Sequence, residues 1–187
     1  MIRNYKINFS KQGNNLVYED NIKGCNVVAY CNNYVLVESD RRLKGIEIQD
    51  IELATILANI ETCKKLDYLQ VLKNKLLALY RYRFEVKGIE LNGLFIPTDR
   101  SSQSMINGAY ASLKNGLINT IDFKCIDKWE TATLETLEPI AKAVAEHVQK
   151  CFSAERLVSE YIDSIEDIDI LRKLDIQDLF NKQLNQN

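Results

Sequence analysis

The stretch IELNGLFIPTDRSSQSMINGAY, residues 89–110, decides the fold, because a turn, a strand end and a helix start follow one another within it. Asn92-Gly93 stands between two short apolar runs, which is the strongest short-range signal for a β-hairpin. Pro97 cannot donate a hydrogen bond to a central strand, so the second strand must end before it. The stretch therefore predicts a β-hairpin at about residues 89–96, followed directly by an α-helix.

The helix after this hairpin begins with a cluster of small polar side chains. Thr98 or Asp99 offers a side-chain oxygen to the free N–H groups of its first turn. Gln103 and Asn107 are one turn apart on the flank of its apolar face, where they can form hydrogen bonds back to the hairpin or across to His147. Gly108 would let another backbone approach closely. We expect Asp99, Gln103 and Asn107 to belong to a polar network that folding alone can explain.

Upstream of the hairpin, the hydrophobic pattern changes from strand-like to helix-like. Residues 5–48 contain short β-branched and aromatic runs separated by glycine and asparagine, which predicts a small antiparallel sheet. Asn32-Asn33 lies between two such runs, and asparagine tolerates the positive φ angles of a two-residue hairpin turn. From about residue 49 to 86, apolar residues recur at helical spacing, in two helices or in one helix bent near Thr62.

Downstream of the capped helix, a short extended segment precedes a long helix. Residues 120–129 alternate apolar and polar side chains and predict one more strand, with Trp129 as a hydrophobic anchor at its end. A helix is predicted at about residues 136–162, with Pro139 in its first turn, where no hydrogen bond is lost. One short helix at about residues 164–180 and a frayed polar end complete the chain.

Together these patterns predict an α+β fold in two regions. Residues 1–48 are expected to form a β-rich N-terminal region, and residues 49–187 a helical region. Within the helical region we expect an α+β domain at about residues 80–162, followed by the short C-terminal helix.

The composition excludes several classes of protein. With 24 Lys+Arg against 26 Asp+Glu, the formal net charge of -2 provides no field that would attract nucleic acid or an anionic membrane. No apolar run reaches the roughly 18 residues of a membrane span, and the N-terminus lacks the apolar core of a signal peptide. The 5 cysteines are scattered without a C-x-x-C pair, which predicts reduced thiols rather than disulfides or a zinc site.

One histidine, His147, is the sole candidate for histidine-dependent catalysis. It precedes Cys151 by one helical turn, a spacing that a nucleophilic pair could use, but the same spacing arises often by chance. A buried imidazole needs a hydrogen-bond partner in any case, so we expect His147 to be structural and to belong to the polar network. Neither a glycine-rich phosphate loop nor a metal-ligand spacing is present, so we expect no catalytic residues, no cofactor and no metal.

The region from about residue 80 to 160 resembles a known family. The matching elements are Gly88, Asn92-Gly93, Thr98-Asp99-Arg100, Ser102-Gln103, Asn107-Gly108-Ala109, Trp129, the helix entry at Leu134, Ala143-Val144 and His147-Val148-Gln149. In order and spacing they resemble the domain-of-unknown-function family DUF4376, which is found in tailed bacteriophages and prophages. The resemblance implies a phage-encoded protein, often encoded near tail or tail-fibre genes, and it supplies no catalytic residues.

The function that follows from this resemblance is a non-enzymatic one. We expect a bacteriophage protein that acts by protein–protein contact, as a structural or assembly protein of the tail or tail fibre. The alternative is a phage-encoded inhibitor of a bacterial defence system, comparable to an anti-CRISPR protein. Both imply a protein partner, no membrane contact, and a location in the bacterial host cytoplasm, from which the protein could be incorporated into the virion.

Overall fold

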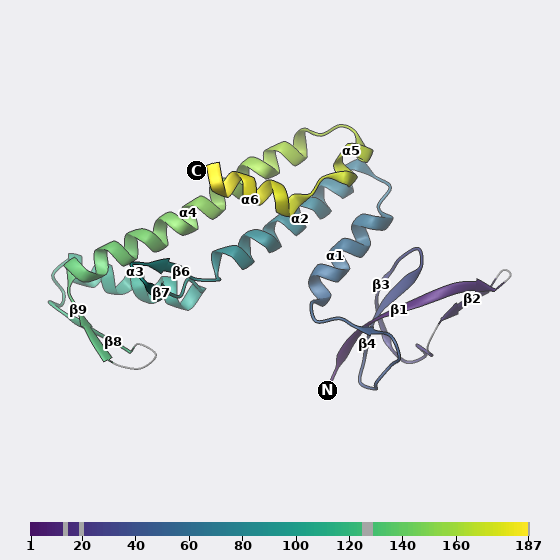
Figure 1. Cartoon of the computed structure of the whole chain (residues 1–187), viewed down its shortest axis with the longest axis horizontal. Coiled ribbons are helices and arrows are strands. Elements are labelled where there is room, and N and C mark those ends of the chain that lie inside the picture. The colour runs from purple at the N-terminus through teal and green to yellow at the C-terminus, as the bar shows by residue number, and fades with distance from the viewer. Residues whose placement is uncertain (13–14, 19–20, 125–128, 187) are drawn as a thin grey trace. The chain divides into compact units, whose positions relative to one another are not determined.

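The structure is a computed structural model that describes residues 1–187 except 13–14, 19–20, 125–128 and 187 (Figure 1). It confirms the predicted mixed fold, with an N-terminal antiparallel sheet followed by helices and hairpins. The strands are β1 (Arg3–Gln12), β2 (Asn15–Tyr18), β3 (Asn26–Tyr30), β4 (Tyr34–Ser39), β5 (Ile46–Glu47), β6 (Ile89–Leu91), β7 (Leu94–Ile96), β8 (Ile121–Lys124) and β9 (Trp129–Ala132). The helices are α1 (Ile51–Thr62), α2 (Leu66–Glu85), α3 (Arg100–Lys114), α4 (Leu134–Ser164), α5 (Ile168–Lys173) and α6 (Ile176–Gln186).

The chain forms two compact units. Unit 1 comprises residues 1–79 and 159–176, and unit 2 comprises residues 80–158 and 177–187. The boundary falls inside α2 and α4, so both helices contribute residues to each unit. The strands of the N-terminal sheet end with β5, and the first helix, α1, follows. The predicted domain boundary between residues 48 and 49 stays a prediction. No helix in the described residues is long and apolar enough to cross a membrane.

Unit 1 is built on an antiparallel sheet with the strand order β2-β1-β4-β3, and β5 adds to β1. Successive side chains of a strand point to opposite faces, and β4 is buried on both. Val35 and Val37 pack with Tyr5 on one face. Leu36 packs with Ala58 of α1 on the other face. The helix therefore covers one face of the sheet, while segments between the strands cover the opposite one.

The hairpin predicted at Asn32-Asn33 is present, but the predicted turn geometry is wrong. β3 and β4 pair on either side of this dipeptide. Among the described residues, Asn92 is the one non-glycine residue with a positive φ, so the turn at Asn32-Asn33 is not a mirror-image turn. The pairing register shifts between Val27 and Ala29. Such a bulge increases the local right-handed twist of the paired strands.

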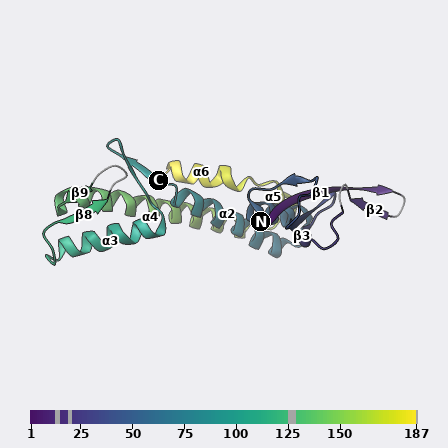
Figure 2. The same cartoon turned by 90° about the horizontal axis from the view of Figure 1, so that it is seen from below.

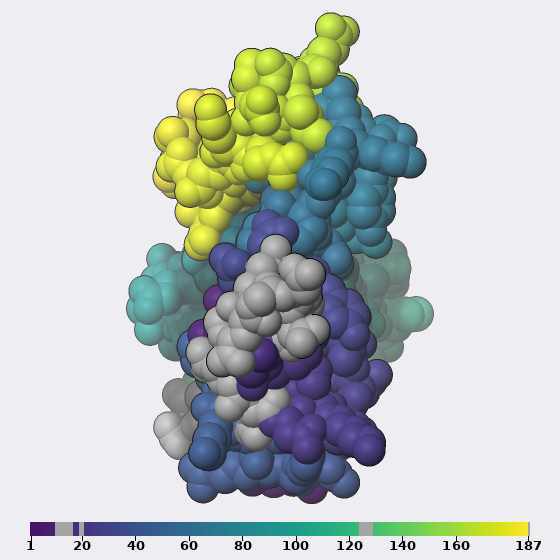
Figure 3. Space-filling model, turned by 90° about the vertical axis from the view of Figure 1, so that its right-hand side faces the viewer, coloured from purple at the N-terminus to yellow at the C-terminus, as the bar shows by residue number. Residues whose placement is uncertain are grey.

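Three side chains in unit 1 satisfy the carbonyl oxygens that helices leave without partners at their C-terminal ends. The donors are Gln70, Lys73 and Arg172. The acceptors are the backbone oxygens of Ile162, Asp163 and Ile165 for Gln70, of Arg172 and Leu174 for Lys73, and of Ile60, Glu61 and Cys63 for Arg172. Burial lowers the pKa of Lys73. Figure 3 shows the start of α2 in blue against the yellow-green residues that end α4.

Arg172 should contribute most to this corner, since its guanidinium reaches Ile60 O at 3.1 Å and Cys63 O at 2.7 Å. We expect Arg172→Ala to lower the free energy of unfolding by about 2 to 3 kcal/mol, because hydrogen bonds from a charged donor are lost and carbonyls are left unpaired. Lys173→Ala is the matched control. Lys173 is exposed, so this substitution should change the free energy of unfolding by less than about 0.5 kcal/mol. Urea unfolding followed by circular dichroism measures both. Equal losses would contradict the capping role.

The C-terminal segment corrects two predictions. Instead of one short helix at about residues 164–180, α4 continues to Ser164 and two further helices follow. The break comes at Leu174, whose φ of -63° and ψ of 124° are extended. The expected frayed end is also wrong, because α6 continues to Gln186 and Phe180 is only 1% exposed. Ile176 and Phe180, four residues apart and both buried, hold a helix in which most of the residues are polar.

Unit 2 packs two hairpins against α3 and α4 (Figure 1 and Figure 2). The β6–β7 hairpin, teal in Figure 2, contributes Ile96 to a cluster with Ile106 and Val144. The β8–β9 hairpin contributes Ile121 and Phe123 to a second cluster. The buried members of this second cluster are Ala109, Leu113 and Leu137, and Ile121 and Phe123 are partly buried against them. The α3–α4 pair therefore supplies the core on which both hairpins rest.

The long helix begins earlier than predicted, which changes the position of its proline. α4 starts at Leu134, so Pro139 is inside the helix rather than in its first turn. Proline has no N–H, and the carbonyl of Glu135 therefore loses its helical partner. The early start is fixed by Thr136, whose Oγ1 accepts from Thr133 N at 2.9 Å. This bond satisfies one backbone donor at the helix entry.

The hairpin turn at Asn92-Gly93 is confirmed, with φ angles of 52° and 78° and with Leu91 paired to Leu94. Gly108, by contrast, lies inside α3, and the close backbone approach predicted there is wrong. A Cβ added at either glycine would meet no atom of the described residues within 4 Å. The backbone conformation alone therefore decides what an added methyl group does at each glycine.

Two glycine-to-alanine variants should consequently have opposite effects. Gly93→Ala should lower the free energy of unfolding by about 1 to 2 kcal/mol, because an L-residue is strained in the left-handed region. Gly108→Ala should raise it by about 0.5 to 1 kcal/mol, because alanine favours the helix. Thermal unfolding of the two variants beside the parent chain measures both. Destabilisation by Gly108→Ala would show that the space beside α3 is occupied.

Candidate functional site

A fully buried carboxylate lies at the centre of unit 2. Glu85, the last residue of α2, is 0% exposed. Its Oε1 accepts from Arg100 Nη1 at 3.1 Å and from Gln103 Nε2 at 3.0 Å. Its Oε2 accepts from Arg100 Nη2 at 3.3 Å and from Arg81, whose Nε also binds Glu155 Oε2 at 2.9 Å. Two arginines therefore balance two glutamates, and the buried charge is compensated.

The backbone carbonyl of Glu85 joins the same network. As the last carbonyl of a helix it has no intrahelical partner. Thr98 Oγ1 donates to it at 2.5 Å, and His147 Nε2 lies 3.0 Å from it. Thr98, itself 0% exposed, also accepts from Gly88 N at 2.9 Å. The carbonyl of Glu85 thus connects the end of α2 through Thr98 to the hairpin base and to the start of α3. Through His147 it connects the same helix end to α4.

His147 and Cys151 do not form a nucleophilic pair in this arrangement. A carbonyl oxygen only accepts hydrogen bonds, so His147 Nε2 must carry the proton that it donates to Glu85 O. The same nitrogen, 4.0 Å from Cys151 Sγ, therefore cannot take the thiol proton. Burial, and then the negative charge of Glu85, raises the pKa of Cys151 to about 11. The thiol stays protonated at neutral pH and lacks the nucleophilic thiolate form.

The structure brings two of the predicted network residues together. Gln103 and His147 both contact Glu85, the first at its carboxylate and the second at its backbone carbonyl. Gln103 Nε2 also donates to Thr98 O at 2.7 Å. Asn107 is exposed on α3 and does not belong to this group. A stacked contact between the His147 and Phe84 rings, 5.5 Å between centroids, further fixes the imidazole.

Asp99 has a separate role as the N-cap of α3. Its carboxylate accepts from Ser101 N at 3.0 Å, and from Ser102 N and Oγ at 3.1 and 2.5 Å. The Ser102 hydroxyl, followed by the Ser102 N–H, lowers the pKa of Asp99. This is the capping predicted for Thr98 or Asp99, while Thr98 is directed to the Glu85 network instead.

The charged members of the network were missed from the sequence. Arg81 and Glu85 are four residues apart on α2, a spacing that indicates an ion pair but equally fits an exposed one. Arg100 belongs to the segment that carries the family resemblance, yet nothing local connects it to Glu85. Among the described residues, no group of three or more His, Cys, Asp or Glu side chains could hold a metal ion.

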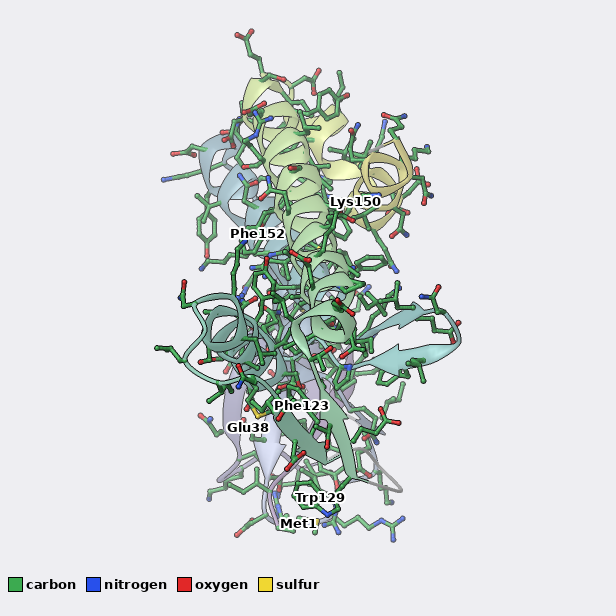
Figure 4. All side chains as sticks on the ribbon, turned by 90° about the vertical axis from the view of Figure 1, so that its left-hand side faces the viewer. Met1, Glu38, Phe123, Trp129, Lys150 and Phe152 are labelled. Carbon is green, nitrogen blue, oxygen red and sulfur yellow. The ribbon has the colours of Figure 1, made fainter. Side chains whose placement is uncertain are left out.

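The β8–β9 hairpin provides a second candidate surface, and it corrects two predictions. The single strand expected at residues 120–129 is two strands, and Cys125 lies outside the described residues. Phe123 packs inward, whereas Trp129, which immediately precedes Glu130, the cross-strand partner of Phe123, lies on the opposite face and is 68% exposed (Figure 4). Trp129 is therefore not the predicted hydrophobic anchor. Within the described chain, β8 and β9 pair only with each other.

A family model described as a domain of unknown function, DUF4376, matches residues 68–177. The chain belongs to the DUF4376 family. No curated protein and no solved structure matches it. The DUF4376 match is longer than the predicted stretch of residues 80–160, since it begins within α2 and ends within α6.

The DUF4376 region contains both candidate sites. It includes every residue of the Glu85 network and the whole of the β8–β9 hairpin, while the N-terminal sheet lies outside it. The network consists of compensated charges that join helix ends, which is the chemistry of a fixed scaffold. The hairpin presents a large aromatic side chain to solvent, which is the chemistry of a contact surface.

Proposed function

We propose that this DUF4376 protein is a non-enzymatic bacteriophage protein that acts by protein–protein contact, as a structural or assembly protein of the tail or tail fibre. The observation that carries the contact role is Trp129, 68% exposed on the outer face of the β8–β9 hairpin. Tryptophan is enriched among the residues that dominate binding energy, because it combines a large apolar surface with one N–H donor.

The hairpin also suits a partner that contributes an extended segment. A two-stranded sheet has two edges whose backbone groups can pair with another strand, and peptide recognition by strand addition uses such edges. The protonated Cys151 and the compensated Glu85 support a scaffold rather than a reaction centre. The resemblance of residues 80–160 to phage proteins supports the tail setting.

Proteomics of purified virions, together with pull-down by the tail-fibre complex of the encoding phage, tests this proposal. We expect the protein in the particle or in the fibre complex. Absence from both would refute the tail role. Rescue of an unrelated phage in a defended host by expression of this chain alone would instead favour the inhibitor of bacterial defence.

The contribution of Trp129 can be measured separately. We expect Trp129→Ala to weaken binding to the tail-fibre complex at least about tenfold, since an aromatic anchor contributes about 2 kcal/mol or more. Phe95→Ala is the matched control, because Phe95 is 61% exposed on the other hairpin of the same unit. Trp129 is also the one tryptophan of the sequence, so its fluorescence should shift to the blue when a partner covers it. Equal weakening by both variants would place the contact elsewhere.

A further inference from the structure

Three Asn-Gly dipeptides occur in the chain, at Asn92, Asn107 and Asn115. In such a pair the glycine nitrogen can attack the asparagine Cγ, because no Cβ on the glycine obstructs the approach. A Cγ–N bond forms, the bond between Cγ and the side-chain amide nitrogen breaks, and that nitrogen leaves as ammonia with the proton of the glycine N–H. A cyclic imide results. Water then opens the imide to aspartate or to isoaspartate. The reaction therefore needs a glycine nitrogen that is not held in a hydrogen bond.

Two of the three dipeptides have this nitrogen engaged. Gly108 lies within α3, where each N–H is bonded to the carbonyl four residues before it. Asn115 is the C-cap of the same helix, and Gly116 N donates to Leu113 O at 3.1 Å. Attack at Asn107 or Asn115 therefore requires the local helix structure to open first.

The third dipeptide is different. Asn92 and Gly93 form the two-residue turn of the β6–β7 hairpin, both are exposed, and both have positive φ angles. Within the described residues, the N–H of Gly93 makes no hydrogen bond, because the turn is closed by the pairing of Leu91 with Leu94. We infer that Asn92 is a built-in deamidation site, at which water converts the side-chain amide to a carboxylate while the other two Asn-Gly pairs are protected.

The product would alter the tip of the hairpin but not its base. Isoaspartate inserts its Cβ into the backbone, so a turn that fits two residues is lengthened and the Leu91–Leu94 pairing is lost. The base is held by Thr98, which accepts from Gly88 N at 2.9 Å and donates to Glu85 O at 2.5 Å. Deamidation should therefore loosen the exposed end of the hairpin and leave the Glu85 network in place.

Ageing of the full-length protein at mildly alkaline pH in heavy-oxygen water, followed by peptide mass spectrometry, tests this inference. We expect heavy oxygen to enter at Asn92 at least about tenfold faster than at Asn107 or Asn115, because helix opening limits the latter. In urea the three dipeptides have equal freedom, so their rates should converge. Equal rates in the folded protein, or protection of Asn92 as strong as that of Asn107, would overturn the inference.

A glycine variant provides the matched control. Asn92→Gly removes the carboxamide and keeps a residue that tolerates a positive φ. We expect no labelled product at position 92 in this variant and unchanged rates at Asn107 and Asn115. Its melting temperature should stay constant on ageing, whereas that of the parent chain should fall as isoaspartate accumulates. An equal fall in both would show that the loss arises elsewhere in the chain.

Discussion

Glu85→Gln should lower the free energy of unfolding by about 3 to 5 kcal/mol, the usual cost of removing one partner from a buried ion pair. The glutamine side chain has almost the same size, so the change removes charge and leaves no cavity. Arg81 would lose its fully buried partner and keep only Glu155. The new amide group would also place a donor where Gln103 and Arg100 already donate. Chemical unfolding, monitored by far-ultraviolet circular dichroism, measures the loss.

Glu146→Gln is the matched control for this prediction. Glu146 pairs with Lys142 on the exposed surface of α4 at 3.8 Å, and its side chain is 61% exposed. Exposed helical pairs contribute only about 0.3 to 0.5 kcal/mol, so the same substitution should have a small effect there. If Glu85→Gln costs no more than Glu146→Gln, the network contributes little to stability. A functional role for the buried carboxylate would then be the better explanation.

Local signals predicted those elements whose conformation is decided within a few residues. Asn92 and Gly93 adopt the positive φ angles that a two-residue hairpin turn requires. Pro97 directly follows the last residue of β7, and Asp99 caps α3. In each case the chemistry of the residue itself favours the observed conformation. The hairpin and the helix start could therefore be predicted without knowledge of their neighbours.

The Glu85 network could not be predicted in the same way, because its members are distant in sequence. Gln103 is 18 positions and His147 is 62 positions from Glu85. The predicted network contained Gln103 and His147 but lacked the carboxylate that connects them. Burial of Glu85 results from the packing of the hairpin base, α3 and α4 around the end of α2. The residues adjacent to Glu85 in the sequence do not indicate that its side chain is buried.

The position of Trp129 was mispredicted for a geometric reason. In one continuous strand over residues 120–129, Trp129 would share a face with Ile121 and Phe123, because side chains alternate with a period of two. The chain instead turns back, and Trp129 pairs with Lys124. Phe123 pairs with Glu130, and the side chains of the neighbouring residues 129 and 130 point to opposite faces, so Trp129 faces away from Phe123. The pairing of β8 with β9 therefore places the aromatic side chain on the surface rather than in the core.

The last helix owes its position to one aromatic side chain, and Phe180→Ala should show this. Phe180 is 1% exposed and meets the Phe84 ring edge-on, with 6.0 Å between centroids and 81° between planes. Truncating a buried phenylalanine to alanine costs about 3 to 5 kcal/mol, because apolar contact is lost and a cavity remains. The cavity would lie beside Phe84, whose ring also stacks on the His147 ring. An 11-residue helix is marginal by itself, so α6 should detach and fray.

Hydrogen exchange of α6 amides and thermal unfolding together test this expectation. Phe152→Ala is the matched control, since Phe152 is 41% exposed on α4 and contacts Arg81 through its ring face at 4.6 Å. Loss of that contact should cost only about 1 kcal/mol and leave α6 protected. Retained protection of α6 in Phe180→Ala would mean that its other apolar residues suffice to hold the helix. Several weaker apolar contacts, rather than one buried ring, would then hold α6 in place.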